Sequence, residues 1–140
     1  MPIDSIAARL EGPVLLLGRL AMGALYVPSG FGKLTNPAGF AHGAPLKVLP
    51  GPLIAWAIVA ALVEFFSSLA IVLGFKTRYA ALLLAVFTLV AAFLAHNYWT
   101  VADPGMHRNQ YVHFWKDIAI VGGLLFVFIR GAGPISIDRR

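Results

Sequence analysis

The sequence predicts an all-α membrane protein: a bundle of four transmembrane helices with a long Gly/Pro-containing loop between the first and second helices. Of its 140 residues, 59% are hydrophobic and only 12% are charged, and the mean hydropathy of +0.81 is far above that of soluble domains. Four apolar segments each approach the roughly 20 residues that span a hydrocarbon core. They are Pro13 to Phe31, Leu53 to Leu73, Tyr79 to Asn97 and Tyr111 to Ile129. We therefore expect residues 1–140 to form a single transmembrane domain.

Ahead of the first span, apolar and charged residues recur at helical spacing. Ile3, Ile6 and Leu10 share one helical face, whereas Asp4 and Arg9 lie elsewhere on it. This pattern is typical of a short helix lying in the membrane interface. A frayed N-terminus explains the same residues equally well, so both interpretations stay open.

Arg19 and Glu64 are charged residues near the middle of the first and second spans. A charged side chain at bilayer depth costs roughly 2.5–3.5 kcal/mol, so we expect the two to face each other or a polar cavity. One face of the first helix is polar or small throughout, and it consists of Arg19, Gly23, Tyr26, Gly30 and Lys33. Two hypotheses follow: a buried Arg19–Glu64 pair that braces the helices, or a carboxylate that handles protons or contacts a substrate.

The loop between the first two spans, Gly32 to Pro52, carries several Gly and Pro residues among apolar side chains. Loops of this length in a small domain are usually functional or disordered. The apolar residues predict that this one lies on the membrane surface or dips into it. The next connection, Gly74 to Arg78, is short enough to be a tight turn.

Polar side chains gather where the third span ends and the fourth begins. His96 and Trp99 follow the third span, and His113, Lys116 and Asp117 lie on one arc of the fourth helix. In the predicted topology these residues lie on the same side of the membrane as Lys33, which makes a candidate polar pocket. Trp115 and Tyr111 fit an interfacial aromatic belt better than the pocket.

Imidazole and carboxylate groups beside aromatic walls suit a flat, partly polar molecule such as a quinone headgroup. A histidine next to a carboxylate can also relay the protons that such a molecule takes up or releases. The two histidines could in principle hold a haem or copper, but they fit interfacial hydrogen bonding better, and we expect no metal site. The chain has no cysteine, so it cannot perform thiol chemistry by itself.

The balance of Lys and Arg predicts the orientation. The net charge of +5 comes from residues at segment ends, which favours anionic lipid over nucleic acid as a partner. The side with both termini and the second connection carries more cations, namely Arg9, Lys76, Arg78, Arg130, Arg139 and Arg140. The opposite side carries Lys33, Lys47 and Arg108, with Lys116 just inside a helix. We therefore expect the N- and C-termini to lie in the cytoplasm.

The chain resembles the DoxX family from about Leu15 to Ile129. An ordered set of segments carries the resemblance: GRLAMGALYVPSGFGKL at 18–34, a Gly/Pro loop, VEFFSSLAIVLGFKTRYAALLLA at 63–85, and the FWKD entry to the fourth helix. The resemblance implies a small bacterial inner-membrane protein, often associated with oxidoreductases. The recurrent polar positions of the family correspond to Arg19, Lys33, Glu64, Lys116 and Asp117. Because cysteine is missing, independent sulfur chemistry is not expected.

Three functional hypotheses follow. In the first, the chain binds a quinone or quinol, with Asp117, His113 and Glu64 as catalytic groups. The substrate-binding groups would then be His96, Lys116, Arg19, Tyr26, Lys33 and Trp99. In the second, it is a non-catalytic anchor or assembly partner of an oxidoreductase, docking through the loops at 32–52 and 103–108. In the third, it transports a small molecule or lipid through a cavity at Arg19 and Glu64. The sequence establishes no bound cofactor and leaves homo-oligomerisation open.

Overall fold

The computed structural model describes residues 2–139 and contains four helices long and apolar enough to cross a membrane. These are α1 (Pro2–Thr35), α3 (Leu53–Leu73), α4 (Thr77–Ala95) and α5 (Pro104–Arg130). Short helices fill the connections: α2 (Pro37–Ala41), η1 (Ala44–Val48) and η2 (Tyr98–Thr100). No strand occurs among the described residues. The all-α, four-span architecture predicted from the sequence is confirmed.

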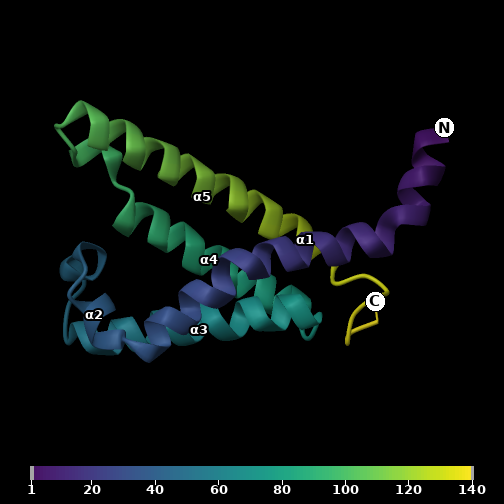
Figure 1. Ribbon diagram of the computed structural model, residues 1–140, viewed down its shortest axis with the longest axis horizontal. Helices are drawn as coiled ribbons and strands as arrows, with labels where there is room; N and C mark the ends of the chain where they lie inside the picture. The colour runs from purple at the N-terminus through teal and green to yellow at the C-terminus, as the bar shows by residue number, and fades with distance from the viewer. Residues whose placement is uncertain (1, 140) are drawn as a thin grey trace.

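The first helix is longer than the predicted span. The structure joins the predicted interfacial segment and the first span into one helix that starts at Pro2. Figure 1 shows the N-terminal turns bent away from the rest of α1. Pro13 lies inside the helix, and a proline there removes a backbone hydrogen bond and kinks the axis. The bent segment leaves Ile3, Ile6 and Leu10 exposed, so their contact with the membrane interface remains a prediction.

The four spans pair into two antiparallel arms. The first arm is α1 with α3, and the second is α4 with α5, while α3 contacts α4 beside the turn that joins them. In that turn Gly74 has a φ of +68° and ends α3, and the Phe75 amide returns to the Ala70 carbonyl at 2.9 Å. Figure 1 shows the two arms diverging toward the end that carries α2, away from both termini.

Glycines set the close approach within the first arm. A Cβ at Gly30 would lie 2.7 Å from the backbone nitrogen of Phe65, and one at Gly23 would collide with the side chain of Val72. Each glycine therefore lets the α1 backbone reach α3 directly. The two contacts also define the antiparallel register, in which each step forward along α1 is one step back along α3.

The loop at 32–52 is folded into the short helices α2 and η1, and its contact with the membrane surface stays a prediction. Ala41 and Leu46 are buried against Ala57 of α3. Phe40 and Leu49 pack around them. Burial of these apolar side chains holds α2 and η1 over the open end of the two arms.

Residues 131–139, called the C-terminal strap here, fold back against the other end of the molecule. The amide of Ile137 donates to the Leu73 carbonyl at 3.2 Å, and that of Asp138 to the Gly74 carbonyl at 2.8 Å. The Asp138 carboxylate accepts from the amides of Lys76 and Thr77 and from the Thr77 hydroxyl, each at 2.9 Å. Burial opposes ionisation of this carboxyl, but these hydrogen bonds and the Lys76 charge lower its pKa below the ordinary 3.8.

Both termini lie at the same end of the arms (Figure 1), as an even number of spans requires. The predicted cytoplasmic orientation of that end remains a prediction. Arg140, one of the cations on which this prediction depends, lies outside the described residues.

Candidate functional site

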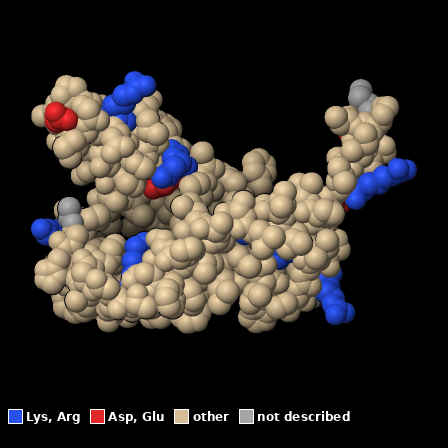
Figure 2. All heavy atoms as spheres, viewed as in Figure 1, with Lys and Arg blue, Asp and Glu red and all other residues tan. Residues whose placement is uncertain are grey.

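A cavity of about 590 Å³ separates the two arms at the end away from the termini. It is called the central cavity here, and all four long helices and the loop at 32–52 line it. Figure 2 shows the hollow between the arms, with basic and acidic atoms at its edges. Its wall is largely apolar, and the polar exceptions are Tyr26, Ser29, Lys33, Glu64, Thr88, His96, Lys116 and Asp117. A volume of this size with few polar groups is typical of a small-molecule site.

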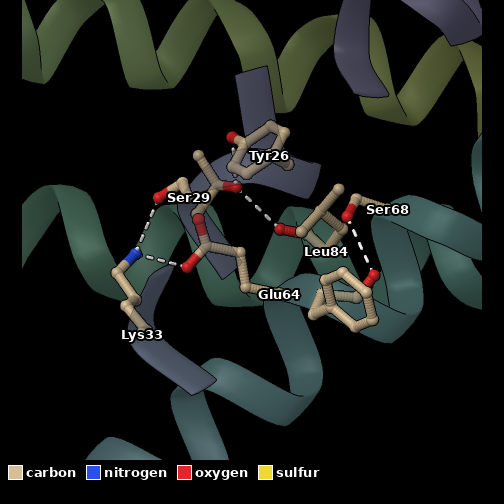
Figure 3. A network of polar contacts seen from close by, with 8 residues as sticks. Tyr26, Ser29, Lys33, Glu64, Ser68 and Leu84 are labelled. Atoms are coloured by element: carbon tan, nitrogen blue, oxygen red, sulfur yellow. Dashed lines mark hydrogen bonds and ion pairs between the residues drawn. The ribbon is translucent and has the colours of Figure 1, made fainter. Parts of the chain in front are cut away.

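On the first arm, Lys33 and Glu64 form a salt bridge across the α1–α3 contact. The Glu64 side chain is 2% exposed and the Lys33 side chain 23%. Lys33 Nζ also donates to the Ser29 hydroxyl at 3.1 Å and lies 5.0 Å from the centroid of the Phe40 ring. Figure 3 shows the ammonium group held between Ser29 and Glu64. The pair thus places one cation and one carboxylate on the cavity wall.

Tyr26 connects the two arms at the cavity floor. Its hydroxyl lies 2.7 Å from Thr88 Oγ1 of α4, and Thr88 in turn donates to the Leu84 carbonyl at 2.8 Å. Both side chains are buried. Thr88 uses its single hydroxyl proton in the hydrogen bond to the Leu84 carbonyl. Only the lone pairs of its oxygen can therefore face Tyr26, so the Tyr26 hydroxyl is the donor.

The second arm contributes a separate polar group on the facing wall. His96 Nδ1 lies 2.7 Å from Gln110 Oε1, and His96 Nε2 lies 3.7 Å from Asp117 Oδ2. His113 stacks on His96 with ring centroids 5.0 Å apart, and its Nδ1 lies 3.0 Å from Lys116 Nζ. The amide oxygen of Gln110 can only accept, so it selects the His96 form with a proton on Nδ1. Nε2 is then directed toward Asp117.

The predicted Arg19–Glu64 pair is wrong. Arg19 donates instead to backbone carbonyls: to Ile71 at 3.3 Å, to Val72 at 3.1 Å, and to Ile135 of the C-terminal strap. The antiparallel register explains the separation between Arg19 and Glu64. Glu64 of α3 lies level with Phe31 of α1, and Phe31 is twelve residues beyond Arg19, which is about 18 Å along the helix at 1.5 Å per residue.

Arg19 is a structural cation at the terminal end of the bundle. It is 2% exposed and lies outside the central cavity. The carbonyls at the end of α3 carry the negative pole of that helix, which compensates the buried charge. Among the described residues, Nε of Arg19 is the one buried side-chain nitrogen or oxygen atom that has no hydrogen-bond partner. Glu64, by contrast, lines the central cavity and forms no salt bridge with Arg19.

The other sequence-predicted residues divide into two groups. Tyr26, Lys33, His96, Lys116 and Asp117 all line the central cavity. His113 adjoins it through His96, whereas Trp99 lies 52% exposed in a cluster of aromatic rings with Phe93 and Phe114. The structure therefore gives Trp99 no contact with the cavity wall.

Sequence reasoning missed Thr88, Gln110 and Ser29. Thr88 and Ser29 interrupt apolar helical stretches, and that interruption is the signal that could have found them. Gln110 gives no such signal in the sequence, because polar residues are common near the start of a helix. Within residues 2–139 no three His, Cys, Asp or Glu side chains group closely enough to hold a metal ion.

One family model and several relatives match the chain. The family model described as DoxX matches residues 14–97. The inner membrane proteins YphA and YqjF of Escherichia coli (strain K12) are each 37% identical to the chain, over 91% and 94% of both partners respectively. The Surfeit locus protein 4 homolog of Drosophila melanogaster is 26% identical over 95% of this chain and 49% of its own length. No solved structure matches significantly.

Proposed function

The chain belongs to the DoxX family of membrane proteins, and we propose that it binds a quinone or quinol in the central cavity as part of a redox system of the inner membrane. The observation that carries the proposal is the presence of a cation and a carboxylate on each wall of a largely apolar cavity: the Lys33–Glu64 salt bridge on one wall, and Lys116 and Asp117 on the other.

This donor set fits both redox forms of such a ligand. The oxygens of a quinone accept hydrogen bonds, which the ammonium groups of Lys33 and Lys116 can donate. The hydroxyls of a quinol donate hydrogen bonds, which the carboxylates of Glu64 and Asp117 can accept. The same walls therefore supply a partner to either form, and the apolar remainder of the cavity accommodates the ring.

The chain's own residues would then hold the headgroup and move protons. Reduction of a bound quinone takes up two protons for two electrons. Asp117, with His96 at 3.7 Å, is placed to accept or deliver a proton at the cavity wall. Glu64 can do the same on the facing wall. The chain has no cysteine to supply electrons, so we expect an oxidoreductase partner or a further cofactor to deliver them.

The binding test uses purified protein and quinone analogues that differ in the headgroup. Wild type should bind in a headgroup-dependent way, and Asp117→Asn and Glu64→Gln should each weaken binding by roughly tenfold, the equivalent of one hydrogen bond to a charged group. Asp103→Asn is the matched control, because Asp103 caps α5 outside the cavity and asparagine caps equally well. Binding that ignores the headgroup, or that survives both cavity variants unchanged, would exclude the proposal.

The second candidate function is transport of a small molecule or lipid through the central cavity. The observation favouring it is that charged groups line a cavity within the spans. Counterflow in liposomes that Glu64→Gln abolishes would favour transport over redox-linked binding. A third candidate, a non-catalytic anchor for an oxidoreductase, predicts that a co-purified enzyme stays attached after the cavity charges are neutralised.

For orientation, we propose that both termini lie in the cytoplasm and that the cavity opens toward the other side. The cations of the terminal end, including Lys76, Arg78 and Arg130, support this arrangement. A reporter fused to the C-terminus should read as cytoplasmic, and a periplasmic reading would reverse the assignment.

A further inference from the structure

The central cavity has two chemically different sides. The side formed by α1 and α5 carries Ser29, Lys33, Lys116 and Asp117. The side formed by α3 and α4 carries Glu64, Thr88 and His96 among mostly apolar side chains, chiefly Val59, Val63, Leu83, Val86 and Val90. A ligand that matches this lining is amphipathic, with its polar part among the charged side chains and its apolar part along the valines of α3 and α4.

The apolar side is also an opening. Val59 of α3 is 51% exposed and Val86 of α4 is 54% exposed, although both line the cavity. A side chain that lines a cavity and is half exposed lies at its rim. Both residues lie well inside membrane-spanning helices, so this rim faces lipid acyl chains rather than water.

Small side chains keep the opening wide. Ala60 of α3 and Ala91 of α4 line the cavity beside the rim valines. Figure 1 shows α3 and α4 diverging from their common turn toward this level. The gap between the two helices therefore widens from the turn at Gly74 to the cavity.

We propose that the ligand carries a long hydrocarbon tail, which leaves the central cavity between α3 and α4 across Val59 and Val86 into the bilayer. This inference rests on the proposed quinone binding and adds the class of ligand, a prenyl- or alkyl-tailed molecule rather than a soluble one. The polar headgroup stays among Lys33, Glu64, Lys116 and Asp117, and the tail remains in hydrocarbon throughout.

The test compares two probes on two tryptophan variants. The probes are a decyl-tailed benzoquinone and the same headgroup without the tail. Val86→Trp fills the proposed exit, and Leu89→Trp introduces the same indole ring into α4 at an exposed position that does not line the cavity. Overpacking an apolar interior costs about 1–3 kcal/mol, so Val86→Trp should weaken binding of the tailed probe by roughly 5- to 150-fold. Binding of the tail-less probe should stay within about twofold of wild type, and Leu89→Trp should leave both probes unaffected.

The possible outcomes separate the two proposals. If Val86→Trp leaves the tailed probe unaffected, or weakens both probes equally, the tail does not leave between α3 and α4, while headgroup binding stands. If neither probe binds wild type, the proposed function fails and this inference fails with it. Val59→Trp fills the same exit from the facing helix and replaces Val86→Trp if that variant does not insert.

A second readout uses a tryptophan already in the cavity wall. The chain has three tryptophans, and Trp99→Phe with Trp115→Phe leaves Trp56, which lines the cavity. A tail-brominated probe should quench Trp56 fluorescence more strongly than its unbrominated counterpart. Equal quenching by the two probes would place the tail away from the α3 side and overturn the inference.

Discussion

Replacing Lys33 should destabilise the protein more than replacing Glu64, although the two residues form one salt bridge. The reason is their unequal burial, because the Glu64 side chain is 2% exposed and the Lys33 side chain is 23% exposed. Within residues 2–139, Lys33 is the hydrogen-bond partner of the Glu64 carboxylate. Lys33→Met therefore leaves a buried carboxylate unpaired.

The expected magnitudes follow from what each variant leaves behind. Removing one partner of a buried pair costs about 3–5 kcal/mol, which we expect for Lys33→Met. Glu64→Gln should cost only about 1.5–3 kcal/mol, the value of a hydrogen bond to a charged group. In that variant Lys33 keeps the Ser29 hydroxyl at 3.1 Å and the Phe40 ring at 5.0 Å. The double variant should be more stable than Lys33→Met alone, because it contains no unpaired charge.

The assay is equilibrium unfolding in mixed micelles by titration with sodium dodecyl sulfate, followed by circular dichroism. Lys47→Met is the matched control, because Lys47 is exposed in the loop at 32–52. It removes the same charge and should change the unfolding free energy by less than about 0.5 kcal/mol. If Glu64→Gln lowers the unfolding free energy more than Lys33→Met does, the unequal burial of the pair does not control its contribution to stability. If the two losses of unfolding free energy add in the double variant, the two residues do not interact as a buried pair.

Two further predictions concern helix packing and the C-terminal strap. Gly30→Ala should cost about 1–3 kcal/mol in the same titration, because the added Cβ would meet the Phe65 backbone at 2.7 Å. Gly32→Ala meets nothing within 4 Å and should be neutral or stabilising by up to about 1 kcal/mol, so equal losses would contradict the close α1–α3 contact. Asp138→Ala removes a helix cap and should cost about 0.5–2 kcal/mol near neutral pH. Because folding lowers the pKa of Asp138, its stabilisation is complete above 3.8 and is lost as the pH falls through the lower folded value. Thermal unfolding curves of wild type and Asp138→Ala should therefore converge at acid pH, and a constant gap would show that the carboxylate is not what stabilises the strap.

The sequence predicted the spans because hydropathy and length are properties of each segment alone. The second predicted span, Leu53 to Leu73, coincides with α3, and the third begins within two residues of α4. The first predicted span is shorter than α1. A polar interfacial stretch that meets a span at Pro13 gives no indication in the sequence that the two form one continuous helix. The C-terminal strap was missed for a related reason. Residues 131–139 have no apolar period, and their structure depends on hydrogen bonds to Leu73, Gly74 and Thr77.

Hydropathy and segment length alone establish a four-span membrane protein, and the charged residues inside its spans need partners. The identity of those partners depends on how the helices pack together. Arg19 and Glu64 belong to facing helices, and their hydropathic context is alike, but the antiparallel register set by Gly23 and Gly30 places them at different depths. Arg19 therefore binds carbonyls at the end of α3, and Glu64 meets Lys33 in the central cavity. Register is a property of two helices together, and for that reason neither segment alone could reveal it.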